Sequence, residues 1–159
     1  MNADVETYSR YIRKQIAGIR DCLAGLSEEQ VNHVPHVHGA NSMYVIGTHV
    51  LGNARAWVLG IVCGQALRRD RPAEFASGGT EAGFAAAAGA LSREIEGALA
   101  RYDGSDLDRP FKPAQELWGE GEVQEITKRI ALADVLEHAS IHLGHVQLTR
   151  DLLPAEGAR

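Results

Sequence analysis

The chain has 159 residues, of which 45% are hydrophobic and 23% are charged, and its formal net charge is −5. This length is enough for one domain with a hydrophobic core and short for two, so we expect a single domain over residues 1–159. The negative charge argues against a nucleic-acid-binding protein, which normally carries a basic patch. The one basic cluster, Arg68, Arg69 and Arg71, is interrupted by Asp70 and is too small to change this expectation.

The cysteines and the apolar segments indicate a cytoplasmic protein. Cys22 and Cys63 form neither a disulfide framework nor a metal-binding motif, and we interpret them as reduced, partly buried thiols. Residues 1–10 are polar and show no secretory signal. The most apolar stretch, residues 44–67, contains Arg55, which is costly to place in lipid. We therefore predict a buried helix there and no membrane span.

Four segments repeat apolar residues at the spacing of a helix that buries one face. They span residues 5–25, 41–67, 80–102 and 128–153. Gly25 suits the left-handed backbone at the end of the first helix. Asn41 or Ser42 can cap the second, and residues 26–34 should add a short helical turn capped by Ser27.

The helical pattern is lost between residues 103 and 128, where Pro110, Pro113, Gly119 and Gly121 interrupt the chain. A loop of this length is usually functional or has structure of its own, so we expect an excursion with a short β-ribbon. The predicted fold is all-α: an up-down type four-helix bundle with this long loop between its third and fourth helices.

Three histidines lie on one side of the fourth predicted helix. His138 and His142 are about 40° apart around the helix axis, and His145 is within about 60° of His142. Val135 and Val146 share this side, so we expect it to face the bundle interior. Imidazoles at positions i and i+4 can both reach one metal ion.

His49 belongs to the apolar stripe of the second predicted helix. A lone histidine on such a stripe is more often an ordinary core residue, but several buried imidazoles without a shared partner leave polar nitrogens unsatisfied. We therefore predict a metal ion between these helices, because helix bundles often build metal sites from side chains on facing helices. His145 could bind the ion directly, or it could orient a substrate or water from behind the ligands.

Other site patterns are absent from the sequence. It contains no Glu-x-x-His motif of di-iron bundles, no His-Glu-x-x-His, no glycine-rich phosphate loop and no serine nucleophile motif. The cluster of His33, His36 and His38 falls in a predicted loop, where histidines are usually solvated, and we expect it to lie outside the site.

The chain resembles the DinB/YfiT-like superfamily over nearly its whole length. The matching features are a helix that opens at residues 41–42 and contains His49, the segment of residues 69–75, and His138-x-x-x-His142 near the C-terminus. In that superfamily one histidine of the second helix and a His-x-x-x-His pair of the last helix bind a divalent ion, usually nickel or zinc. The resemblance therefore implies that His49, His138 and His142 are the metal ligands.

The resemblance also implies an activity. Relatives that look like enzymes include thiol-dependent S-transferases and a thiol-dependent maleylpyruvate isomerase, which use a low-molecular-weight thiol as cosubstrate. Three neutral imidazoles leave a coordination position for a thiol, or for water in a hydrolase, so we expect an enzyme acting on small molecules. The alternative is a non-catalytic, stress-associated bundle whose ion mainly staples helices. The resemblance to a superfamily whose members tend to dimerise, together with the small residues of the second helix, makes a homodimer plausible.

Overall fold

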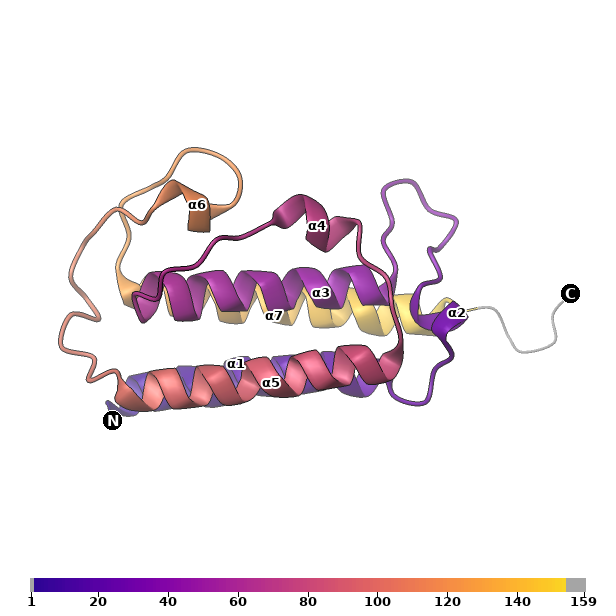
Figure 1. Ribbon diagram of the computed structural model, residues 1–159, viewed down its shortest axis with the longest axis horizontal. Coiled ribbons are helices and arrows are strands. Elements are labelled where there is room, and N and C mark those ends of the chain that lie inside the picture. Colours follow the sequence, from indigo (N-terminus) through magenta and orange to yellow (C-terminus); the bar gives the residue numbers. More distant parts are fainter. Residues whose placement is uncertain (1, 154–159) are drawn as a thin grey trace, which may run out of the picture.

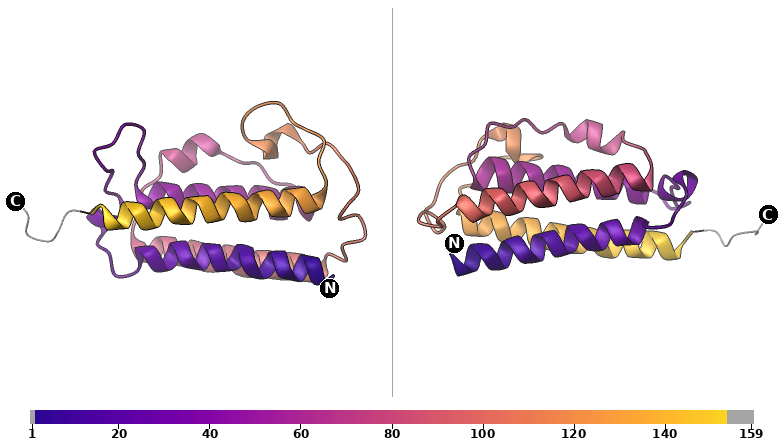
Figure 2. Two further views of the ribbon diagram at one scale, coloured as in Figure 1. Left: turned by 180° about the vertical axis from the view of Figure 1, so that it is seen from behind. Right: turned by 60° about the horizontal axis from the view of Figure 1, so that its bottom comes forward.

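The computed structural model describes residues 2–153, and this part of the chain is all-helical, which confirms that the fold is all-α. Four long helical segments lie alongside one another, and three short helices join them (Figures 1 and 2). The long segments are α1 (Ala3–Leu23), α3 (Met43–Ala54) with its continuation η1 (Arg55–Val62), α5 (Glu81–Arg101) and α7 (Lys128–Asp151). The short helices are α2 (Glu28–Val31), α4 (Arg71–Phe75) and α6 (Gln115–Trp118).

The helix ends agree with the capping signals in the sequence. The side chain of Ser42 accepts a hydrogen bond from the backbone N–H of Val45 at 3.2 Å, so Ser42 and not Asn41 caps α3. Ser27 caps α2 in a capping box with Gln30. The second long helix ends at Val62, earlier than predicted, and Gly64 follows it with a left-handed φ of +71°.

The second half of the second long helix is a π-helix, which the sequence did not predict. η1 continues α3 without a break (Figure 1). Trp57 of η1 stacks on Trp118 of α6, with ring centroids 5.1 Å apart. Leu117 fills the space beside Gly60, where a Cβ atom would lie 2.9 Å from Leu117 Cδ1. These contacts fix α6 against η1.

The excursion between α5 and α7 contains less β-structure than predicted. Phe111 and Ile126 form one antiparallel bridge through backbone hydrogen bonds of 2.9 and 3.0 Å, and no longer strand forms within residues 2–153. Pro110 and Pro113 stand on either side of the bridge position, and a proline has no N–H to continue the pairing. The expected ribbon is therefore a single pair of residues.

The small residues of α3 receive side chains from the same chain. A Cβ atom on Gly47 would lie 2.6 Å from the ring of Phe84, a core residue of α5 that is 2% exposed. Gly52 is covered in the same way by Glu74. The glycines that indicated a close partner helix are thus used inside the fold, and they no longer support a homodimer.

One helical stretch, Met43–Val62, is long and apolar enough to cross a membrane by length and composition alone. Of its apolar window, 72% is buried by the rest of the fold. Burial of this extent is also seen in core helices, which is what we expected of residues 44–67.

Candidate metal centre

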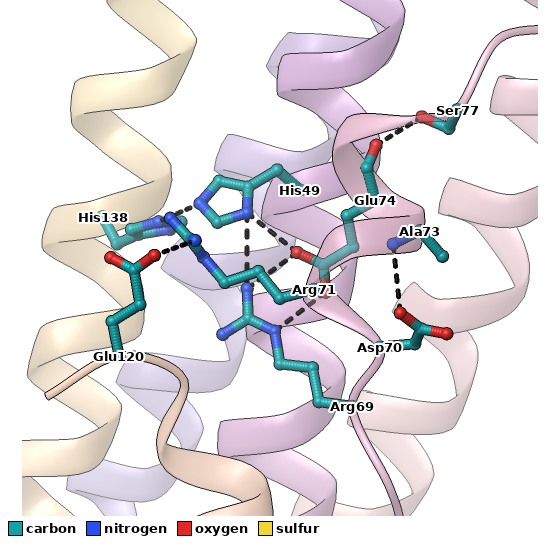
Figure 3. Close-up of polar contacts among 9 residues, drawn as sticks. All are labelled: His49, Arg69, Asp70, Arg71, Ala73, Glu74, Ser77, Glu120 and His138. Carbon is teal, nitrogen blue, oxygen red and sulfur yellow. Dashed lines mark hydrogen bonds and ion pairs between the residues drawn. The ribbon is translucent and has the colours of Figure 1, made fainter.

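Three of the predicted histidines meet between α3 and α7. His49 comes from α3, and His138 and His142 come from successive turns of α7. One ring nitrogen from each lies within 4.8 Å of the other two, and Nε2 of His49 is 3.1 Å from Nε2 of His138 (Figure 3). His49 is 7% exposed, and the other two are partly buried.

The donor set fits a divalent ion. Two imidazole nitrogens bound to one tetrahedral zinc ion are about 3.3 Å apart, because each Zn–N bond is about 2.0–2.1 Å. The 3.1 Å between His49 and His138 is close to that separation. Nδ1 of His138 is buried and has no hydrogen-bond partner among the described residues. Imidazole nitrogen suits zinc and nickel equally, so the donor set does not choose between them.

A buried carboxylate adjoins His49, and the sequence analysis did not identify it. Glu74 of α4 is 7% exposed, and its Oε2 lies 2.8 Å from Nδ1 of His49 (Figure 3). Arg69 donates to both oxygens of Glu74, at 2.8 Å from Nε and 2.9 Å from Nη2. Burial raises the pKa of Glu74, but hydrogen bonds from His49 and Arg69 outweigh it and hold the pKa below its usual value. The carboxylate is therefore ionised and accepts from His49.

Aromatic and charged side chains cover the centre on the α4 side. The ring of Phe75 lies 4.8 Å from the ring of His49. The guanidinium of Arg71 lies 4.8 Å from the centre of the Phe75 ring and forms an ion pair with Glu120 of the excursion (Figure 3). Helix α4 and the excursion thus meet beside the three histidines.

The remaining histidines are placed differently from one another. His145 is exposed, so the prediction that it faces the interior was wrong; its position on α7, rotated from His142, brings it to the rim. Its Nδ1 is still 3.3 Å from Nδ1 of His142. His33 and His36 pair with each other, with ring centroids 6.3 Å apart. His38 lines a cavity that reaches His142, although we expected it outside the site.

An open cavity of about 450 Å³ lies beside the candidate centre and has His142 and His145 in its wall. The rest of its lining comes from the loop before α3 and from the ends of α3 and α7, and no Asp, Glu, Lys or Arg contributes. Its main apolar residues are Pro35, Val37, Ile46, Leu148 and Leu152. Another cavity of about 470 Å³ adjoins Leu67 and Leu117 and contains no histidine, so it is not the candidate site.

Both α7 histidines are held neutral by the fold. Burial lowers the pKa of His138 to about 3, with further lowering by His142, His49 and Arg69. Burial also lowers the pKa of His142 to about 4, helped by His49 and His145. Neutral imidazoles are the form that binds a metal ion.

These shifts predict that the metal-free protein loses stability in mild acid. In the unfolded chain both histidines titrate near pH 6.5, so between about pH 6.5 and their lowered pKa values the unfolded state binds more protons. Stability is fully present above pH 6.5 and falls as the pH drops toward 4. Urea unfolding of metal-free protein from pH 7.5 to 4.5 should show this fall, and it should be smaller in a His138→Gln/His142→Gln variant. Equal pH dependence of the two proteins would contradict the assignment.

Comparison with protein families agrees with this site. The chain matches the family model described as mycothiol-S-transferase over residues 7–155. No curated protein and no solved structure matches it. The matched family is part of the DinB/YfiT-like superfamily, so the resemblance seen in the sequence is confirmed. Because the match covers nearly the whole chain, the chain belongs to the mycothiol-S-transferase family.

Proposed function

We propose that the protein is a metal-dependent S-transferase that joins a low-molecular-weight thiol to a small electrophile in the cytoplasm. In this proposal His49, His138 and His142 hold a nickel or zinc ion, and the four long helices form an up-down bundle of the DinB type. The observation that carries the proposal is that a three-histidine group borders an open cavity in a chain of this family. The ion, when bound, would supply a coordination position on which a thiol loses its proton.

The chain's own residues account for the rest of the reaction. The thiol sulfur forms a bond to the electrophilic carbon, and the leaving group departs with its electron pair. His145 lines the cavity next to His142, and in this proposal it takes the S–H proton. Because the lining is largely apolar and contains no Asp, Glu, Lys or Arg, an uncharged and largely apolar electrophile fits the cavity best.

The open cavity favours this enzyme over a bundle whose ion only staples helices. A stapling ion needs no access, whereas His142 is in the wall of a cavity within the size range of small-molecule sites. Water could enter the same position, so hydrolysis is the second candidate activity.

A matched pair of electrophiles tests the proposal. Zinc- or nickel-loaded protein is incubated with mycothiol and either neutral iodoacetamide or anionic iodoacetate, and thioether formation is followed by mass spectrometry. We expect acceleration with iodoacetamide and a kcat/KM at least about tenfold lower with iodoacetate, because the largely apolar lining would remove water from the carboxylate and provides no Lys or Arg to pair with it. A panel extended to 1-chloro-2,4-dinitrobenzene and to esters distinguishes transfer from hydrolysis. Fully loaded protein that accelerates no reaction of the panel would refute the enzyme and favour the stapling role.

A further inference from the structure

Glu74 contacts His49 but does not belong to the three-histidine group, so its role has to be inferred separately. We propose that Glu74, held by Arg69, is a positioning residue that fixes the protonated nitrogen of His49 and thereby sets the affinity of the centre for its ion. This inference rests on the proposed metal centre.

Hydrogen bonds from Arg69 and His49 hold the carboxylate of Glu74 in place. Its Oε1 accepts from Arg69 Nε, and its Oε2 accepts from both Arg69 Nη2 and His49 Nδ1. Arg69 Nη2 also lies 3.4 Å from His49 Nδ1, but both atoms donate to the same oxygen, so no bond joins them. On its other side the carboxylate lies against Gly52 of α3, where a Cβ atom would overlap it. The fork of Arg69 holds the carboxylate, and the missing side chain of Gly52 leaves the space that the carboxylate occupies.

This arrangement decides the state of His49. Both oxygens of Glu74 already accept hydrogen bonds from Arg69, so the carboxylate also acts as the acceptor toward His49. Nδ1 of His49 therefore carries the proton, and Nε2 carries a lone pair. A metal ion would bind this lone pair, and Nε2 of His49 lies 3.1 Å from Nε2 of His138. A carboxylate that accepts the N–H of a ligand histidine also makes the other ring nitrogen more basic and so a stronger metal ligand. Loss of such a carboxylate typically weakens metal affinity 10- to 100-fold. His138 lacks such a carboxylate, because its buried Nδ1 makes no hydrogen bond with any described residue.

The protonation state can be measured in the unaltered protein. Nitrogen-15 NMR of the metal-free chain should show that the neutral ring of His49 carries its proton on Nδ1. A His49 ring protonated at Nε2 instead would overturn the proposal, and this measurement does not depend on any variant folding.

Two variants with matched controls test the effect on affinity. We expect zinc binding, measured by competition with a chelating dye, to weaken about 10- to 100-fold in Glu74→Gln. Glu94→Gln is the control, because Glu94 also pairs with an arginine but is exposed on α5, and it should change zinc affinity by less than about twofold.

Gly52→Ala should weaken binding similarly by displacing the carboxylate, although it keeps both Glu74 and Arg69. Its control is Gly144→Ala on α7, where an added Cβ meets nothing within 4 Å. Wild-type affinity in both Glu74→Gln and Gly52→Ala would overturn the positioning role. A wild-type protein that binds no zinc would instead refute the metal centre itself, so the two failures are distinguishable.

Discussion

Replacing His138 by alanine should abolish tight binding of zinc or nickel and remove the stability that the ion provides. A ligand at about 100 times its dissociation constant stabilises the folded state by about 2.7 kcal/mol. For a chain of this length that loss should lower the thermal midpoint by roughly 5–10 °C, to the value of the metal-stripped wild type. Elemental analysis and calorimetry of the two proteins, each with and without a chelator, provide the measurement.

His49→Ala and His142→Ala should behave in the same way, because all three rings are within reach of one ion. His145→Ala should do less, since its Nδ1 contacts His142 from the exposed rim. His33→Ala is the matched control: it removes an imidazole that packs against another loop histidine, His36, and it should leave metal content unchanged. Full metal content in His49→Ala together with its loss in His145→Ala would place the ion on α7 alone.

Replacing Arg69 by methionine should lower the free energy of unfolding by about 3–5 kcal/mol, because it leaves the buried charge of Glu74 without its main partner. The side chains of Arg69 and Glu74 are only 6% and 8% exposed. A second substitution, Glu74→Met, in the same chain should recover most of the loss, since the unpaired charge is then gone. Urea unfolding of metal-free proteins measures these effects without any contribution from the ion.

The control for this prediction is Arg55→Met. Arg55 and Glu94 form an ion pair whose side chains are about half exposed, at 48% and 47%, and such pairs contribute little to stability. A loss in Arg69→Met no larger than that in Arg55→Met would show that the buried pair is not maintained in solution.

The apolar periodicity of the sequence was enough to predict the long helices, because a helix that buries one face repeats its apolar residues every three or four positions. It was less reliable where that rule does not apply. The second long helix was predicted to reach residue 67 but ends at Val62, and its π-helical half was not foreseen. Helices α4 and α6 were missed because they are too short to show a period.

By itself, the sequence determined that His138 and His142 share one helix face, and its resemblance to the DinB/YfiT-like superfamily implied His49 as the third ligand. Spacing along one helix fixes such neighbours, because 3.6 residues complete a turn. Only the tertiary structure decided that Glu74 reaches His49, a contact between residues 25 positions apart and on different helices. No local pattern encodes that contact, because it depends on how a short segment packs across α3 and on the space that Gly52 leaves for a carboxylate.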